Sequence, residues 1–432
     1  MTLFVGNLQI MLIYFKVGNY KSIKEPIVIN FTAAAINEHQ ESNVLAREKN
    51  NLLKSVILHG PNASGKSKII DALKFFRQFI LHSAQDRHST ADIPTEVFEL
   101  NSSTLNQPSF FETEFLIGKK TYRYGFEADT KYIHKEWLLE VKVTTESPIF
   151  LRIEQEFQIN AKKFINADGL EKRTRKNALF LSVADQWNVP LAEDIIAWYD
   201  SIYIVNGLKD ADFKTESTKM LKDSRYEDLI NNMIRKADLG INSLEVINSP
   251  DEYQMLRFMN SSYDFDINTV NKNLNSIAAL HNVYNDNGEV VNVAHFSIEK
   301  KESEGTQKFY NLSGIFLQAI MHGKLIIMDE MDARLHTLLT KAIIHLFNNA
   351  DVKSGAQLLA VSHDTALLDG DILRRDQIYF VEKDSFSATK VTSLAEFKVR
   401  KETPYAKNYL EGKYGAIPFI ENLETIIKDS NE

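Results

Sequence analysis

The spacing of apolar and polar residues changes along the chain and marks where strands and helices are expected. The run Val56-Ile57-Leu58 is entirely apolar and ends just before Gly60, which is typical of a buried strand. Beyond the following turn, apolar residues recur every three or four positions, as on one face of a helix. They are Ile69, Ile70, Leu73, Phe76 and Ile80. The pattern predicts a strand, a glycine-containing turn and an amphipathic helix in this order.

The last third of the chain repeats this alternation. Strands that alternate with helices favour a largely parallel sheet, and in such sheets binding residues gather at the carboxyl ends of the strands. The predicted elements are a helix from Ser303 to Gly323, a strand over Leu325–Met328 that ends in Asp329-Glu330, a helix over 338–347, and strands over Gln357–Val361 and Ile378–Val381.

The region between these two parts contains both kinds of spacing. The segments with β character are 110–117, 121–126 and 137–144, with a hairpin turn at Lys119-Lys120. They predict a small antiparallel sheet, and two further short strands are expected between Tyr14 and Phe31. The segments with helical spacing are 178–186, 191–199 and 226–237. Because no long heptad run is present, we expect a mostly helical insertion here and no long coiled coil.

Composition narrows the setting of the protein. The 432 residues include no cysteine, which excludes disulfides and thiolate metal sites. The net charge of −8 provides no overall field that would hold nucleic acid. Local basic clusters at Lys162-Lys163, Lys172–Lys176 and Lys398 with Arg400 and Lys401 are interpreted as solvated faces. No apolar run reaches the roughly 20 residues that span a bilayer, and the N-terminus does not resemble a signal peptide. We expect a cytoplasmic protein without a membrane partner.

The turn after the first buried strand has the spacing of a phosphate-binding loop (P-loop). It reads Gly60-Pro61-Asn62-Ala63-Ser64-Gly65-Lys66-Ser67. Backbone N–H groups of the loop and of the helix start would surround the phosphates of a nucleotide such as ATP, since they have no partners within the helix. Lys66 would reach the β- and γ-phosphates, and Ser67 would bind Mg²⁺. The alternative is an ordinary glycine turn before a helix.

Two further strand ends supply the side chains that a nucleotide hydrolase needs. Asp329 would complete the shell of Mg²⁺, which keeps several waters and requires few protein ligands. Glu330 is predicted as the general base that deprotonates the attacking water. His363 would contact the γ-phosphate. A strand cap at Asp329-Glu330 and a structural histidine are the alternatives.

The segment Ser303-Glu304-Gly305-Thr306-Gln307 predicts a second anion site, because a small hydroxyl residue and a glycine open a helix. The P-loop is already complete within one chain. The second site is therefore expected to act in trans, on the nucleotide of another subunit.

Together these motifs resemble the ATP-binding-cassette (ABC) class of ATPases, in which two heads sandwich two ATP molecules. The segments Asn19–Ile23 and Tyr409–Pro418 are similar to stand-alone bacterial AAA-family ATPases of the overcoming-lysogenization-defect and structural-maintenance-of-chromosomes (SMC) type, which occur in abortive-infection and other phage-defence systems. The resemblance is weakest over residues 150–298. It implies that Ser303 and Gly305 contact the γ-phosphate across a dimer interface. It also implies that Asp332 lies in the loop that couples the two active sites.

Three features depart from this family pattern or have no assigned role. The signature contains Glu304 where cassette transporters have glycine. A glutamine that would contact Mg²⁺ remains open among four candidates, which are Gln107, Gln155, Gln158 and Gln186. His336 matches a histidine found shortly after the acidic pair, without an assigned role.

We therefore predict an α/β fold of the P-loop NTPase, ABC-ATPase type, with a mostly parallel core sheet, a small antiparallel subdomain and a largely helical insertion. The expected segments are an N-terminal lobe at 11–150, the insertion at 151–298 and a C-terminal lobe at 299–432. The predicted function is an ATP-hydrolysing switch that dimerises with ATP and acts in anti-phage defence through a separate effector, a nuclease or toxin. Asp369-Gly370-Asp371 is interpreted as a capping turn and not as a nuclease motif. The alternatives are a DNA-binding repair or chromosome ATPase, and the motor subunit of a transporter.

Overall fold

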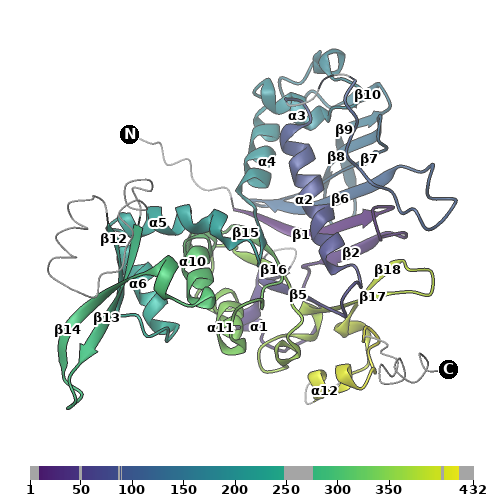
Figure 1. Cartoon of the computed structure of the whole chain (residues 1–432). Helices are drawn as coiled ribbons and strands as arrows, with labels where there is room; N and C mark the ends of the chain where they lie inside the picture. The colour runs from purple at the N-terminus through teal and green to yellow at the C-terminus, as the bar shows by residue number, and fades with distance from the viewer. Residues whose placement is uncertain are drawn as a thin grey trace, which may run out of the picture. The chain divides into compact units, whose positions relative to one another are not determined.

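The computed structural model describes residues 9–47, 51–85, 88, 90–247, 276–399 and 403–417. The predictions that involve Arg400, Lys401 and Pro418 lie outside these residues. The chain forms two compact units (Figure 1). The first combines residues up to 204, 323–329 and those from 344 onward, and the second combines 205–322 and 330–343. The boundaries of these two units differ from those of the three segments expected from the sequence. The three segments therefore stay a prediction.

The first unit contains the predicted parallel sheet. Its strand order is β11-β15-β16-β5-β17-β18. The bounds are β11 (Tyr203–Asn206), β15 (Leu325–Asp329), β16 (Gln357–Val361), β5 (Ser55–His59), β17 (Ile378–Lys383) and β18 (Thr389–Ser393). Strands β15, β16, β5 and β17 are parallel, and β18 is antiparallel to β17. Every residue of β5 and β16 is buried, as expected for strands covered on both faces.

A seven-stranded antiparallel sheet also belongs to the first unit, in the order β10-β9-β8-β7-β6-β1-β2. The bounds are β1 (Ile10–Gly18), β2 (Ile27–Asn30), β6 (Ser109–Ile117), β7 (Lys120–Ala128), β8 (Ile133–Val141), β9 (Glu146–Ile153) and β10 (Glu156–Ile159). The predicted sheet is present, and the N-terminal strands extend it because β1 pairs with β6 from Ile10↔Ile117 onward.

Helix α2 (Lys66–His82) packs against this antiparallel sheet together with α3 (Phe180–Gln186) and α4 (Pro190–Ser201), as Figure 1 shows. The ring of Phe76 on α2 lies 5.4 Å from Phe126 and 5.7 Å from Tyr199 of α4, measured between ring centroids. These aromatic contacts hold the helix that follows the P-loop. All three rings belong to one large cluster of buried apolar side chains.

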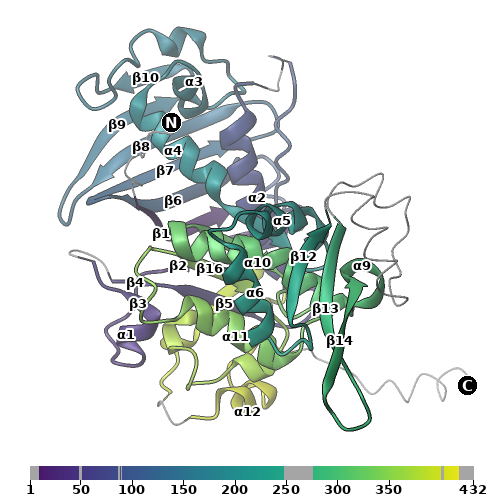
Figure 2. The same cartoon turned by 90° about the vertical axis from the view of Figure 1, so that its left-hand side faces the viewer.

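The second unit is built around α10 (Glu304–His322), which packs on α5 (Lys214–Lys222) and α6 (Glu227–Lys236). Figure 2 shows these helices beside the three-stranded antiparallel sheet of β12 (Ser243–Ile247), β13 (Ser276–Tyr284) and β14 (Val290–Ser297). A β-carbon on Gly314 of α10 would lie 2.5 Å from the backbone nitrogen of Ser217, so glycine permits the close approach of α10 and α5. The sequence pattern did not predict the β13–β14 hairpin or α5.

Short elements complete the chain. They are α1 (Gln40–Asn43), β3 (Val44–Leu45), β4 (Leu52–Leu53), α9 (Ile298–Lys301), α11 (Thr337–Phe347) and α12 (Tyr405–Leu410). Tyr409 of α12 and Tyr414 beyond this helix stack on Phe380 of β17, with ring centroids 5.4 Å and 5.1 Å away. Within the described part of the chain, no helix is both long and apolar enough to cross a membrane.

Candidate functional site

The P-loop runs from the end of β5 to the start of α2, and close contacts require both of its glycines. A β-carbon on Gly60 would lie 2.1 Å from the carbonyl oxygen of Val381 on β17. Gly65 has φ of 107°, and its β-carbon would lie 2.0 Å from Oγ1 of Thr389 on β18. Any larger residue would displace the loop from these two strands. The glycines of the motif thus fit the loop tightly against the sheet edge.

Lys66 lies inside this loop and is buried. Its Nζ donates hydrogen bonds of 2.7 Å to the carbonyl oxygens of Gly60 and Pro61. In contrast, Ser67 is exposed in the first turn of α2, as are Asn62 and Ala63 in the loop. The loop therefore holds its ammonium group inside and presents hydroxyl and backbone groups outside, which is the arrangement that a phosphate site needs.

Thr389 supports the loop from outside, and the sequence analysis did not identify it. Its Oγ1 donates to the carbonyl oxygen of Ser64 at 3.0 Å and lies 2.8 Å from the Oγ of Ser22. Because the single hydroxyl proton of Thr389 is used toward Ser64, Ser22 is the donor in the second bond. Lys21, next to Ser22, pairs with Asp71 of α2 at 3.1 Å. The family-like N-terminal segment 19–23 is thus joined to the P-loop and its helix.

Asp329 and His363 lie where the P-loop does, at the carboxyl ends of the parallel strands. Asp329 is the last residue of β15 and His363 follows β16, and both strands run parallel to β5, with Met328 opposite Ala360 and Val361 opposite Leu58. Only β16 separates β15 from β5, so the two strand axes are roughly 10 Å apart. Asp329 is half-buried and His363 is exposed. The first unit therefore brings the P-loop, the predicted metal ligand and the predicted phosphate sensor to one edge.

The donor groups at this edge suit Mg²⁺. The Ser67 hydroxyl and the Asp329 carboxylate are oxygen ligands of the kind that this ion prefers. Among the described residues, no group of three or more His, Asp or Glu side chains is placed to hold a metal ion alone. Ser67 and Asp329 therefore fit a Mg²⁺ ion whose remaining ligands are phosphate oxygens and water.

His59, the last residue of β5, is a buried residue that the sequence analysis missed. Its Nε2 has no hydrogen-bond partner. Burial lowers the pKa of His59 to about 3, and the nearby charges of Lys66 and His363 act in the same direction while Asp364 opposes them. The imidazole is therefore neutral in the physiological range. No pattern in the sequence distinguishes it from an ordinary strand residue.

The second unit carries the other predicted residues, namely Ser303, Gly305, Glu330 and Asp332. The Oγ of Ser303 accepts a hydrogen bond of 3.1 Å from the backbone N–H of Thr306 and so caps α10. A β-carbon on Gly305 would lie 2.6 Å from the carbonyl oxygen of Arg334. The start of α10 and the loop 330–334 are therefore in direct contact, and the glycine of the signature permits it.

Lys308, one turn into α10, organises the loop 330–334 and was also missed. Its side chain is fully buried, and Nζ donates to the carbonyl oxygens of Ala333 at 2.7 Å, Met331 at 3.1 Å and Glu330 at 3.4 Å. Burial, together with the charge of Arg334, lowers the pKa of Lys308 to about 8, while the nearby carboxylates of Asp210, Asp332 and Glu330 act in the opposite direction. Glu330 itself has a left-handed backbone with φ of 50°, which is unfavourable for a residue with a side chain. One ammonium group thus holds a strained loop.

The same loop is held from its other end by Arg334. This residue forms an ion pair with Asp210, and Asp210 also accepts a hydrogen bond of 2.7 Å from Nδ2 of Asn311 on α10. Arg334 donates in addition to the carbonyl oxygen of Gly207 at 3.0 Å. The loop with Glu330 and Asp332 is thus fixed to α10 at two positions, Lys308 and Asn311.

Several other sequence features find local roles. His336 accepts a hydrogen bond on Nδ1 from the backbone N–H of Leu338 at 3.2 Å, at the start of α11. Oδ1 of Asp369 accepts from the N–H of Asp371 at 3.0 Å within a turn, and no helix begins at these residues. Among the glutamine candidates, Gln155 follows β9 and Gln158 lies on the edge strand β10. The structure assigns none of the four as a magnesium contact.

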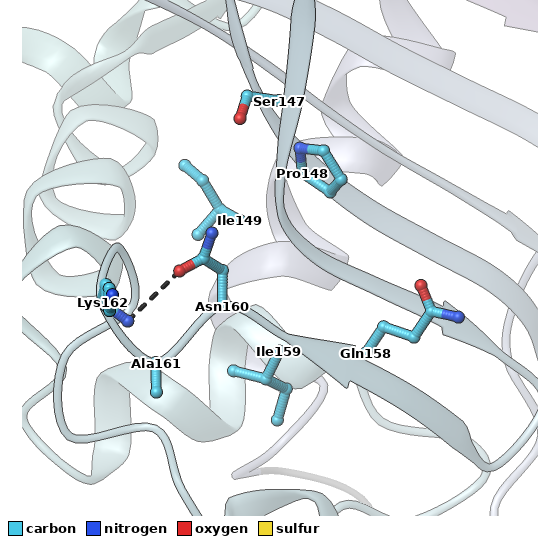
Figure 3. A pocket seen from close by; sticks show the side chains of 8 residues that line it. All are labelled: Ser147, Pro148, Ile149, Gln158, Ile159, Asn160, Ala161 and Lys162. Atoms are coloured by element: carbon cyan, nitrogen blue, oxygen red, sulfur yellow. Dashed lines mark hydrogen bonds between the residues drawn. The ribbon is translucent and has the colours of Figure 1, made fainter.

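A shallow hollow of about 550 Å³ lies elsewhere in the first unit, where β9 and β10 meet (Figure 3). Figure 3 shows Lys162 beside Asn160, whose Oδ1 accepts from the backbone N–H of Lys162 at 3.2 Å. The hollow is open, and its lining includes the glutamine candidate Gln158 but no residue of the P-loop and neither Asp329 nor His363. It is therefore not the nucleotide site.

Comparisons with known proteins found similar solved structures and one matching family model. The SMC head domain from Thermotoga maritima is 12% identical with a TM-score of 0.41, and the match covers 89% of this chain and 98% of that chain. The Smc head domain bound to the C-terminal domain of ScpA, derived from Pyrococcus furiosus, is 13% identical with a TM-score of 0.37, and the match covers 94% and 100%. No curated protein matches the chain. The family model described as "AAA domain, putative AbiEii toxin, Type IV TA system" matches residues 55–369. Because this match covers more than half of the sequence, the chain belongs to this family of AAA domains.

Proposed function

We propose that the protein binds ATP with Mg²⁺ and hydrolyses it to ADP and phosphate. The observation that carries the proposal is the P-loop, in which a buried Lys66 is enclosed by glycines that fit against β17 and β18. Its position at one sheet edge with Asp329 and His363 gives further support. Membership in a family of AAA domains agrees with a nucleotide ligand.

In this mechanism Lys66 exchanges its partners when the nucleotide binds. Its ammonium leaves the carbonyl oxygens of Gly60 and Pro61 and takes phosphate oxygens in their place, which offsets the cost of breaking the two bonds. Ser67 and Asp329 would hold Mg²⁺, which neutralises charge on the phosphates. His363 would donate a hydrogen bond to the γ-phosphate.

Glu330 is proposed as the general base. Its carboxylate accepts a proton from the attacking water while the water oxygen bonds to the γ-phosphorus and the bond to the bridging oxygen of ADP breaks. The backbone of Glu330, held by Lys308, would fix the direction of that carboxylate. Replacing Glu330 with Gln should permit ATP binding and stop hydrolysis.

We further propose that two protomers close on ATP. Ser303 and Glu304 are exposed at the start of α10, where backbone N–H groups favour an anion. A second protomer's nucleotide would lie against Ser303 and Gly305, with Asp332 in the loop that links both sites.

The decisive experiment measures phosphate release, ATP binding and molar mass in solution for four variants beside the wild type. Lys66→Ala should lose binding, Glu330→Gln should form an ATP-dependent dimer, and Ser303→Arg should bind ATP but neither dimerise nor hydrolyse it. Ser102→Arg adds the same charge at an exposed position in a different loop and should behave like the wild type. Normal hydrolysis by Ser303→Arg would refute the sandwich, and unchanged ATP binding by Lys66→Ala would refute the P-loop assignment.

A role in anti-phage defence with a separate nuclease or toxin as effector is proposed on the description of the family alone. The test is phage plating on cells that express the gene with and without its neighbouring genes. Protection that needs a neighbour and is lost in Glu330→Gln would support the role, whereas equal plaque numbers in all strains would contradict it.

A further inference from the structure

The hairpin between β17 and β18 leaves the sheet at the same edge as the P-loop. Strand β17 runs parallel beside β5, with Phe380 opposite His59, so both strands end on one side. Its return strand begins at Thr389, the residue whose hydroxyl touches Ser64. The turn 384–388 therefore starts and ends next to the P-loop.

This turn holds its shape by its own hydrogen bonds. Oδ1 of Asp384 accepts from the backbone N–H of Phe386 and of Ala388, both at 2.9 Å. Nζ of Lys383 donates to the carbonyl oxygen of Ser387 at 2.6 Å. Phe386, at the tip, is 75% exposed. A rigid turn thus presents one aromatic ring to solvent, and ordering that ring on a ligand would cost little entropy.

The order of the strands indicates which part of a nucleotide would face this hairpin. Strand β15, which ends at Asp329, and strand β16, which is followed by His363, lie on one side of β5, and β17 and β18 lie on the other. Since the γ-phosphate must reach the side of Asp329, the sugar and base extend toward the opposite side. Phe386 precedes Thr389 by only three residues, so the Cα atoms of these two residues lie at most roughly 11 Å apart.

Two lysines, Lys68 and Lys383, lie on the elements that flank the P-loop. Lys68 lies in the first turn of α2 and is exposed. Lys383 ends β17, and burial lowers its pKa, while the charge of Asp384 raises it and that of Lys68 lowers it. The positive charges of Lys68 and Lys383 would attract the α-phosphate of a nucleotide in the P-loop. Phe386 follows Lys383 by three residues.

We propose that Phe386 stacks on the base of the nucleotide that the P-loop holds, and so selects a nucleoside triphosphate over a bare triphosphate. Aromatic rings stack on any base face, and the exposure of Phe386 leaves its ring open to such a contact. The inference rests on the proposed nucleotide binding and adds the residue that recognises the base.

The experiment titrates ATP and inorganic triphosphate, each with Mg²⁺, into the wild type, Phe386→Ala, Phe386→Trp and Lys66→Ala. Phe386→Ala should weaken ATP binding about tenfold and leave inorganic triphosphate binding unchanged. Phe386→Trp should keep ATP affinity, and its indole fluorescence should be quenched by ATP but not by triphosphate. Val143→Ala, which shortens another exposed apolar side chain of the same unit, is the matched control and should change neither affinity.

The outcomes separate this inference from the proposed function. If Phe386→Ala binds ATP as tightly as the wild type, or loses ATP and triphosphate to the same extent, stacking is refuted while Lys66-dependent binding stands. If the wild type binds neither ligand, or Lys66→Ala binds both normally, the nucleotide site itself is refuted and the role of Phe386 with it.

Discussion

Lys308 offers the sharpest test of how the second unit controls chemistry. Replacing it with methionine keeps an unbranched side chain of similar length and removes the ammonium group. The carbonyl oxygens of Ala333 and Met331 then lose donors at 2.7 Å and 3.1 Å, and that of Glu330 loses a longer contact at 3.4 Å. The loop 330–334 would keep the contacts of Arg334 with Asp210 and with the carbonyl oxygen of Gly207.

The expected effect on stability is small because two large contributions oppose each other. A hydrogen bond from a charged donor contributes ~1.5–3 kcal/mol, so the two short bonds stabilise the loop by several kcal/mol. Against this, the pKa of Lys308 lies at about 8 in place of 10.5, so the folded protein disfavours the charged form by roughly 3 kcal/mol. We expect Lys308→Met to lower the free energy of unfolding by about 1–2 kcal/mol.

The effect on hydrolysis should be much larger. Glu330 has φ of 50° and needs its surroundings to hold that backbone, so loss of Lys308 should let the carboxylate move. A misplacement of about 1 Å can lower kcat ~100-fold. Phosphate release, ATP binding and urea unfolding should be measured together, with the exposed Lys219→Met of α5 as control. Near-wild-type kcat in Lys308→Met would refute the idea that this ammonium positions the base, as would an equal loss in Lys219→Met.

Three other measurements test individual contacts. The pKa of Lys308 is lower in the folded than in the unfolded protein, so the unfolded chain binds more protons between pH 8 and 10.5. The wild type should therefore gain stability relative to Lys308→Met as the pH rises through this range. Urea unfolding at pH 8 and 10 measures this difference. Thr389→Val removes the hydroxyl that holds the P-loop and should weaken ATP binding about fivefold in calorimetric titration, whereas Thr392→Val on the same strand should not. Glu136→Leu leaves the buried guanidinium of Arg152 unpaired and should cost about 3–5 kcal/mol in urea unfolding; a loss below about 1 kcal/mol would contradict a buried ion pair.

The core sheet could be predicted because its strands are buried on both faces. Short and continuous apolar runs between helical segments are typical of buried strands. Leu325–Met328 and Leu358–Val361 are two such runs, and both lie in strands of the parallel sheet. The P-loop was equally predictable, since its glycine and lysine spacing is tied to one backbone geometry. The hairpin β13–β14 was not, because its outer strand alternates weakly and its end carries exposed apolar residues such as Val290 and Val291.

The residues that support the site could not be predicted, and the reason is that their contacts are distant in sequence. Thr389 meets Ser64 across more than three hundred residues, and nothing in the neighbours of a threonine on a strand indicates such a contact. Lys308 looks like an ordinary polar position next to the signature segment, yet its ammonium is buried under three carbonyl oxygens. The groups that would touch ATP follow from a motif, whereas the groups that position them depend on how the strands and helices pack. Variants of Thr389 and Lys308 therefore test the packing that the motif requires, and variants of Lys66 and Glu330 test the motif alone.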